Sequence, residues 1–356
     1  EPALCARLQS TSGGASDTEL KELAVRPTSS PSAVRAVTMV TPVANMPSEA
    51  RNSRAEKSGG RAERLAGGAD DMETESTRTV INNPAMNSLP AFTVLGSGPT
   101  VLMLHGIGGG HLAFAPQVET LAQAGYRAVA WDMPGYGRSA PIEPYTFKAL
   151  AQSCIDLIDA LRCESVVLLG HSMGGMVAQE VIARRPDKVK KLILCGTSAA
   201  FGKRTDGRSA EAWAQQFIGQ RTAPLDAGKT MADMAATLVP QMVGPGALPE
   251  GARLAEHCMA GVPAATYRRA LECLVTFDRQ AALADIRVPT LLLGGEFDRV
   301  AAPAVMKQMA AAIPRARYAE LAGIGHLMNL EAPDEFDALL LAFLREPEPK
   351  PLPDTH

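Results

Sequence analysis

The sequence predicts an α/β fold, in which a mostly parallel central sheet carries helices on both faces and a helical cap is inserted into the chain. From about residue 78 onward, short apolar runs that end in glycine or a polar residue alternate with segments of helical periodicity, as in the strand–helix units of a parallel sheet. The alternation stops at about residues 199–280, where several helical patterns follow one another without a convincing strand. We therefore predict one domain over residues 78–346 with a cap at about 199–280.

The elements of this domain follow one another along the chain in a regular order. Continuous apolar runs are typical of strands that are buried on both faces. Such strands are predicted in "PAFTVLG" (90–96), "TVLMLHG" (100–106), "RAVAWDMPG" (127–135), "SVVLLG" (165–170), "KLILCG" (191–196), "TLLLGGEFD" (290–298) and "ARYAELAGIGH" (316–326). Helices are predicted from Phe147 to Leu161, over 176–185, and in "PAVMKQMAAAI" and "PDEFDALLLAFL" after the last two strands.

Residues 1–77 and 347–356 are predicted to be tails outside the domain. The N-terminal segment contains stretches such as "RNSRAEKSGGRAERLAGGADD", which lack apolar periodicity. Such a segment cannot bury enough apolar surface to offset the entropy of ordering, so we expect it to be mostly disordered. A targeting extension and an over-extended reading frame that begins at Met72 or Met86 are alternatives. Acidic residues such as Glu19 and Glu22 argue against a transit peptide.

Composition argues against several classes of protein. The 356-residue chain has a net charge of −3 and no basic block with interleaved aromatic residues, so we predict no binding to nucleic acid. No apolar run approaches the roughly 18–20 residues that span a bilayer, so we predict no membrane segment. The six cysteines form no CxxC pair, which is typical of a reducing compartment. We expect a cytoplasmic protein with a small-molecule substrate, and the sequence does not indicate its oligomeric state.

The segment "GHSMGG" places Ser172 between a predicted strand and a predicted helix. It matches G-x-S-x-G in the context of a nucleophilic serine held on a tight turn. Glycines at 170 and 174 allow the close approach of strand and helix that such a turn requires. An incidental serine in a glycine-rich turn is the structural alternative, and the flanking strand and helix favour the nucleophile.

A serine hydroxyl is a poor nucleophile unless a base accepts its proton, and the base needs an acid that orients it. His326 follows the last strand in "GIGHLMNLEAP", and Asp298 follows the preceding strand in "GGEFDRV". The order Ser172, Asp298, His326 is the one expected when the nucleophile lies on such a turn. Glu296 is an alternative acid, but it lies nearer the body of its strand. We predict a triad of Ser172, His326 and Asp298.

The glycine-rich turn "HGIGGG" (105–110) follows another predicted strand and exposes backbone N–H groups. The amide of Ile107, together with the amide of Met173, is predicted to stabilise the oxyanion that forms during acyl transfer. A phosphate-binding loop is the alternative for glycines after a strand. The turn lacks the Lys-Ser/Thr of a P-loop and does not fit G-x-G-x-x-G with an acidic ribose ligand.

Taken together, "HGIGGG", "WDMPGYGRS", "GHSMGG", "GGEFD" and "GIGH" resemble the α/β-hydrolase superfamily over roughly residues 78–346. The resemblance implies an eight-stranded sheet, a helical cap and a hydrolytic site without a cofactor. Within the superfamily, the combination looks most like 3-oxoadipate enol-lactonases and related carboxylesterases, and carbon–carbon hydrolases of aromatic degradation are close neighbours. The chain departs from many enol-lactonases at the "HGIGGG" turn.

Other polar and aromatic residues have weaker functional signals. The spacing of His105, His111 and His171 does not match H-E-x-x-H or a similar ligand frame, so we predict no metal. His105 and His171 are interpreted as local hydrogen-bonding residues, and Asp132 as a residue that stabilises a turn. In the cap, Trp213, Phe217 and Met234 are candidates for the lining of a substrate pocket, with plain core packing as the alternative. Arg268 and Arg269 are candidates for contact with a substrate carboxylate, and an exposed helix face is the favoured interpretation.

These residues predict a hydrolase of small-molecule carboxylic esters or (enol-)lactones that forms an acyl-serine intermediate. A carbon–carbon hydrolase would use the same triad, and an acyltransferase or perhydrolase would differ only in the nucleophile that resolves the acyl-enzyme. A non-catalytic ligand receptor predicts loss of a triad residue, whereas all three are present. Epoxide hydrolases and haloalkane dehalogenases would need Asp in place of Ser172, so we reject those two activities.

Overall fold

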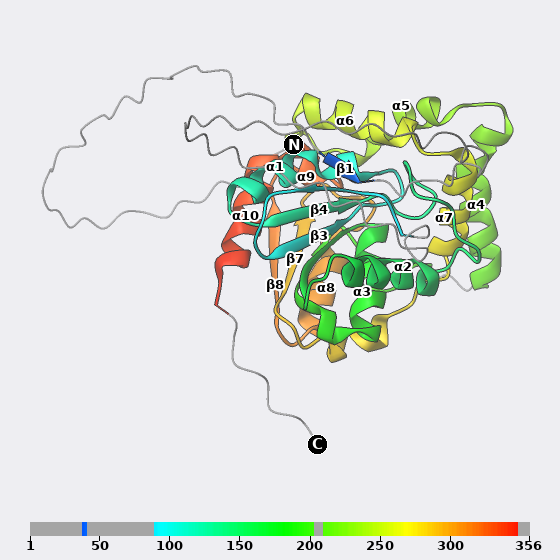
Figure 1. The fold of residues 1–356 in the computed structure, drawn as a ribbon. Coiled ribbons are helices and arrows are strands. Elements are labelled where there is room, and N and C mark those ends of the chain that lie inside the picture. Colours follow the sequence, from blue (N-terminus) through cyan, green and yellow to red (C-terminus); the bar gives the residue numbers. More distant parts are fainter. Residues whose placement is uncertain (1–37, 41–88, 203–208, 348–356) are drawn as a thin grey trace, which may run out of the picture. The chain divides into compact units, whose positions relative to one another are not determined.

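The structure, a computed structural model, describes residues 38–40, 89–202 and 209–347 (Figure 1). The predicted N-terminal tail, residues 1–77, lies outside the described residues except for 38–40. The predicted C-terminal tail also lies outside them after residue 347. Residues 38–40 form a strand that the sequence analysis did not anticipate. Three residues are too few for a period-two pattern to be recognised.

The described residues form a sheet of eight strands in the order β1-β2-β4-β3-β5-β6-β7-β8. Strand β2 pairs antiparallel with both β1 and β4, and the remaining neighbours pair in parallel. The prediction of a mostly parallel sheet is thus confirmed. The strands are β1 (Thr38–Val40), β2 (Phe92–Leu95), β3 (Thr100–Leu104), β4 (Arg127–Trp131), β5 (Val166–His171), β6 (Val189–Cys195), β7 (Thr290–Gly295) and β8 (Ala316–Leu321).

Helices cover both faces of this sheet (Figure 1). Along β3, Leu102 and Leu104 pack on one face while Val101 and Met103 pack on the other, because successive side chains of a strand point to opposite sides. Both faces are apolar, which explains the continuous apolar runs in the sequence. The first face packs against α2 (Phe147–Ala160), α3 (Met173–Arg184) and α8 (Pro303–Ala312), and the second against α1 (Ala115–Gln123) and α10 (Pro333–Arg345).

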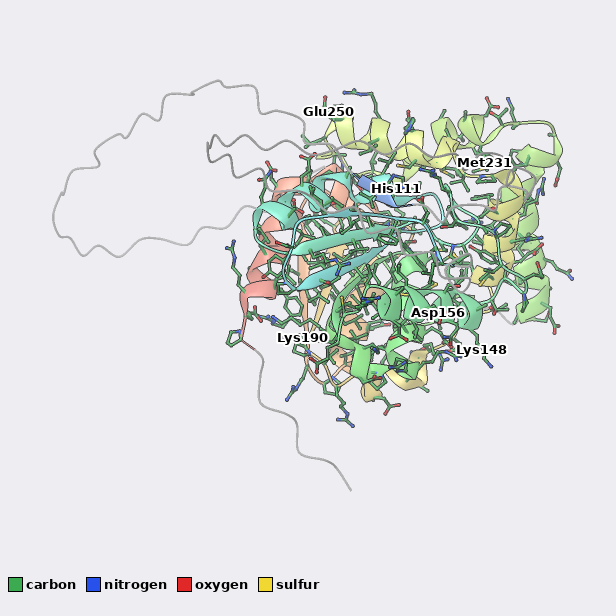
Figure 2. All side chains as sticks on the ribbon, viewed as in Figure 1. His111, Lys148, Asp156, Lys190, Met231 and Glu250 are labelled. Carbon is green, nitrogen blue, oxygen red and sulfur yellow. The ribbon has the colours of Figure 1, made fainter. Side chains whose placement is uncertain are left out.

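Between β6 and β7 the chain forms the predicted helical cap. Its described helices are α4 (Ala210–Asp226), α5 (Met231–Met242), α6 (Pro249–Ala260) and α7 (Ala264–Leu274). Figure 2 labels Met231, the first residue of α5, and Glu250, the second residue of α6. Helix α5 begins at a capping box in which Thr230 and Asp233 satisfy each other's backbone amides. A bridge between Ala200 and Asp278 joins the two ends of the cap next to the sheet.

Two further observations concern the helices and the cysteines. Within the described ranges, no helix combines the length and the apolar character needed to cross a bilayer. The five cysteines in the part of the chain that the structure describes are free thiols. A cytoplasmic location stays a prediction.

Candidate active site

Ser172 lies on a strained turn between β5 and α3. Its backbone has φ 53° and ψ −120°, a conformation that costs a non-glycine residue about 1–3 kcal/mol. Its N–H donates to the Cys195 carbonyl at 2.9 Å, and its own carbonyl accepts the Thr197 hydroxyl at 2.8 Å. The neighbouring strand therefore holds the turn in place, and the side chain of Ser172 is directed out of the strand-to-helix corner into a cavity.

Glycines around Ser172 are required by close backbone packing. A Cβ on Gly174 would lie 2.1 Å from the Leu104 carbonyl oxygen, and a Cβ on Gly170 would lie 2.5 Å from the carbonyl oxygen of Gly174. Both distances are far below a normal contact, so a side chain at either position would push α3 away from β3 and β5. The G-x-S-x-G spacing is thus a packing requirement of the turn.

His326 and Asp298 form a buried pair at the ends of β8 and β7. The Nδ1 atom of His326 lies 2.9 Å from Asp298 Oδ2, and both side chains are almost completely buried. The other oxygen of Asp298 accepts the amides of Val300 at 2.7 Å and Ala301 at 2.8 Å. Burial alone raises the pKa of Asp298, but the interaction with His326 and the two amide hydrogen bonds outweigh it and hold the pKa below its ordinary value.

The alternative acid, Glu296, does not reach this histidine. Its side chain is exposed and accepts the amide of Gly323 at 2.8 Å. The structure therefore brings Asp298, and not Glu296, to His326.

The backbone of His326 is held by two segments that are distant in sequence. Its N–H donates to the Met242 carbonyl at the end of α5, at 2.7 Å. Its carbonyl oxygen lies 2.8 Å from Nε2 of His171, the residue before Ser172. Burial, with a smaller contribution from the neighbouring His326, lowers the pKa of His171 to about 3, so His171 is neutral and donates its Nε2–H. The sequence analysis interpreted His171 as a local hydrogen-bonding residue, whereas its hydrogen-bond acceptor in the structure lies 155 residues away in the chain.

Glu331 anchors the loop that carries His326, and the sequence analysis did not single it out. Its carboxylate accepts three backbone amides, those of Gly244, Gly325 and Leu327, each at 2.7 Å. Burial raises the pKa of Glu331, and these three hydrogen bonds oppose that rise. The available signal was a single glutamate in the apolar run "HLMNLEAP", because a buried carboxylate requires nearby donors.

The "HGIGGG" turn is oriented by hydrogen bonds from two directions. The Met133 amide donates to His105 Nε2 at 2.9 Å, so Nδ1 carries the proton and donates to the Gly106 carbonyl at 2.8 Å. The Gly109 amide donates to the same carbonyl at 3.0 Å. Burial lowers the pKa of His105 to about 4, which keeps the imidazole neutral. Because the Gly106 carbonyl is held from two sides, the Ile107 N–H on the other side of that peptide has a defined direction.

The two backbone N–H groups predicted for the oxyanion site are free to donate a hydrogen bond to a ligand. Among the described residues, neither the Ile107 N–H nor the Met173 N–H donates to a protein acceptor. Met173 is the first residue of α3, where backbone N–H groups have no partner within the helix. Tyr136 donates its hydroxyl to the Ile107 carbonyl at 3.0 Å, a second contact that the sequence analysis missed.

A cavity of about 500 Å³ lies between the sheet edge and the cap. Ser172, His326, Ile107 and Met173 all contribute to its wall, which is otherwise mostly apolar. Phe217 also lines the cavity. The residues that complete its apolar wall include Met176, Phe201, Leu238, Val239, Met242, Ala255, Met259, Leu271, Leu274 and Leu330.

The prediction for two other cap residues was wrong. Trp213 does not line the cavity but stacks behind it on Phe217, with ring centroids 5.2 Å apart. Met234 is buried in the core beneath the cap. Apolar residues of the cap helices face both the cavity and the core. Sequence alone therefore did not separate the residues that face the cavity from those that face the core.

Asp132 and His111 form a second carboxylate–imidazole pair. Asp132 Oδ1 accepts the His111 backbone amide and lies 2.9 Å from His111 Nδ1, which agrees with a turn-stabilising role for Asp132. Figure 2 labels His111, which begins the short helix before α1. In the described ranges, no group of three or more His, Cys, Asp or Glu side chains comes together in a way that could hold a metal ion.

The neutral buried histidines predict a dependence of stability on pH. His105 and His171 have pKa values of about 4 and 3 in the folded protein, against an ordinary 6.5. As pH falls from 6.5 toward 4.5, the unfolded chain binds protons that the folded chain does not, so the free energy of unfolding is expected to decrease. Urea unfolding of wild type and His105→Gln between pH 7.5 and 4.5 measures this. The slope of the free energy of unfolding against pH is expected to be smaller in His105→Gln by about 1 kcal/mol per pH unit. Equal slopes in the two proteins would contradict a neutral, buried His105.

The chain is similar to known proteins over most of its described length. A family model described as alpha/beta hydrolase fold matches residues 99–333. The chain is 31% identical over 303 residues to an epoxide hydrolase of Caballeronia sordidicola, covering 71% of this chain and 89% of that enzyme. It is 29% identical over 258 residues to the polyketide synthase ThaQ of Burkholderia thailandensis, covering 70% of this chain but only 12% of the synthase.

Solved structures agree with this match. The crystal structure of the enol-lactonase from Burkholderia xenovorans LB400 superposes with a TM-score of 0.61 and 26% sequence identity. The similarity covers 72% of this chain and 96% of the enol-lactonase. The shared fold therefore extends over nearly the whole of that enzyme.

Proposed function

The chain belongs to the α/β-hydrolase family, and from that premise we propose that it hydrolyses small-molecule carboxylic esters or lactones through an acyl-serine intermediate, without a cofactor. The observation that carries the proposal is the convergence of three features on one cavity. Ser172 lies on a strained turn, His326 is paired with Asp298, and two unpaired amides face the same space. The likeness to an enol-lactonase supports it, because a lactone is an internal ester.

In the proposed reaction, Ser172 Oγ attacks the acyl carbon while His326 Nε2 accepts the hydroxyl proton. The negative charge that forms on the carbonyl oxygen is stabilised by the N–H groups of Ile107 and Met173. Asp298 holds the imidazole through Nδ1 and stabilises its protonated form. His326 returns the proton to the leaving alcohol, and then activates a water molecule that hydrolyses the acyl-serine.

No hydrogen bond joins Ser172 and His326 in the described part of the chain. In enzymes without bound substrate such contacts are commonly long and shorten in the Michaelis complex. The proposal requires only that both side chains line the same cavity, which they do.

The name of one relative suggests an alternative that the chemistry of the turn disfavours. Attack on an epoxide by this fold would use a carboxylate nucleophile at the position of Ser172. This chain carries a hydroxyl there, and its carboxylate, Asp298, is engaged with His326 and two backbone amides. The proposed function therefore remains ester or lactone hydrolysis.

Covalent labelling tests the proposal directly. A fluorophosphonate probe, which reacts with activated serines, is expected to modify Ser172, as located by peptide mass spectrometry. p-Nitrophenyl butyrate is expected to give an initial burst of p-nitrophenol followed by slower turnover, because an acyl-serine accumulates. Ser153→Ala, a substitution on α2 outside the cavity, serves as the control and is expected to label normally. Labelling that spares Ser172, or turnover that persists after complete labelling, would overturn the proposal.

A further inference from the structure

One arginine in the wall of the cavity has no carboxylate partner. Arg221, on α4, is half-buried and lies with its guanidinium carbon 3.5 Å from the centroid of the Phe217 ring. Burial lowers its pKa, although an arginine remains charged at any physiological pH. Among the described residues, no Asp or Glu pairs with it. By contrast, Arg268 on α7 lies 2.6 Å from Asp226, and Arg269 lies 3.5 Å from Glu143.

The described lining of the cavity contains no acidic residue at all. Its cations are Arg221 and the exposed Arg299, next to Asp298 in sequence. Arg221 donates to the Phe217 carbonyl at 3.5 Å but has no partner of opposite charge among the described residues, and an anion that entered the cavity would supply that interaction. Removal of water from the apolar wall would also strengthen that interaction.

Tyr267, on α7, adds a neutral hydrogen-bond donor next to Arg221. Its side chain is buried and lines the same cavity. Burial raises its pKa, and the positive charge of Arg221 opposes that rise. Within the described residues the Tyr267 hydroxyl forms no hydrogen bond. A guanidinium and a phenolic O–H on one wall match the acceptors of a carboxylate.

We propose that Arg221 and Tyr267 bind a carboxylate on the acyl part of the substrate, so that the preferred substrates are half-esters of dicarboxylic acids or lactones that carry a free carboxylate. This inference rests on the proposed function. The acyl part is assigned to this subsite because it stays in the cavity through both acylation and deacylation. The alcohol of an ester leaves after the first step, whereas the alcohol of a lactone stays attached to the acyl part. Ser172 and Arg221 line the same cavity, and its mostly apolar wall suits a methylene chain between the two carbonyl groups.

Matched esters test the subsite within one protein sample. Mono-p-nitrophenyl adipate and p-nitrophenyl hexanoate differ only in a terminal carboxylate or methyl group. The ratio of their kcat/KM values is independent of the fraction of active enzyme, so partial unfolding of a variant does not change it. Wild type is expected to prefer the adipate, and Arg221→Gln to lower the ratio about 10- to 100-fold.

Two further variants sharpen this test. Arg221→Lys is expected to retain part of the preference, because it keeps the charge but loses the planar fork. Arg268→Gln, a cap arginine outside the cavity lining, is expected to leave the ratio as in wild type. A wild-type preference for the hexanoate, or a ratio that Arg221→Gln does not change, would overturn the subsite while the proposed function stands.

A binding measurement separates failure of the subsite from failure of the proposed function. If wild type hydrolyses neither ester, the proposed function fails, and the subsite is still tested with amides that the enzyme need not cleave. N-butyl adipamate and its neutral counterpart N-butyl hexanamide are compared by calorimetry. Tighter binding of the adipamate that Arg221→Gln abolishes supports the subsite, and equal binding of the two amides overturns it.

Discussion

Replacing Ser172 by alanine is expected to lower kcat/KM for p-nitrophenyl butyrate by about 10⁴- to 10⁶-fold. Without Oγ no acyl-enzyme forms, and the remaining amides of Ile107 and Met173 stabilise only direct attack by water. The measurement is steady-state turnover combined with the burst phase, which is expected to disappear.

The control for this prediction is the fold of the variant. Alanine occupies the same turn with one heavy atom fewer. The hydrogen bonds with Cys195 and Thr197 use the backbone N–H and C=O of residue 172 and not the Ser172 hydroxyl. The thermal unfolding midpoint of Ser172→Ala is therefore expected to stay close to that of wild type. A folded Ser172→Ala protein that retained turnover would show that another residue is the nucleophile.

Replacing Asp298 by asparagine is expected to lower kcat/KM for the same ester by about 10³- to 10⁴-fold. The carboxylate accepts the His326 Nδ1–H at 2.9 Å, which leaves Nε2 free to accept the serine proton. Asparagine has no charge with which to stabilise the imidazolium, and its amide can present a donor to Nδ1 that favours the wrong tautomer.

Glu296→Gln is the matched variant for Asp298→Asn. Glu296 is two residues away on the same loop, is exposed, and accepts only the Gly323 amide among its described contacts. Its replacement is expected to change kcat/KM by no more than about 2-fold, within the range usual for exposed sites. A large loss in Glu296→Gln together with full activity in Asp298→Asn would transfer the role of the acid to Glu296.

The central strands and the serine turn were predictable because their signals are local. The continuous apolar runs of β3, β5, β6 and β7 reflect burial on both faces. The glycines at 170 and 174 reflect backbone contacts that exclude a Cβ. Helix α1 and strand β1 were not anticipated, since the first is a short helix soon after a glycine-rich turn and the second is three residues long.

The supports of the site were less accessible to sequence reasoning. Glu331 accepts the amide of Gly244 across 87 residues of chain, and His171 contacts the His326 carbonyl across 155. No local pattern specifies which distant backbone group a buried side chain will meet. Arg221 and Trp213 illustrate the same difficulty, because the rotation of α4 against Phe201 places the arginine in the cavity wall and the tryptophan behind it.

The α/β architecture, the helical cap, and the order of Ser172, Asp298 and His326 after three strands of the sheet could be predicted from the sequence alone. Periodicity and glycine spacing are properties of neighbouring residues, so they can be recognised without knowing the fold. Only the tertiary structure decided that Asp298 rather than Glu296 meets His326, that Glu331 anchors the histidine loop, and which cap residues line the cavity. Those outcomes depend on packing between segments far apart in the chain. A shift of one residue in such a loop or helix changes which side chain faces the site.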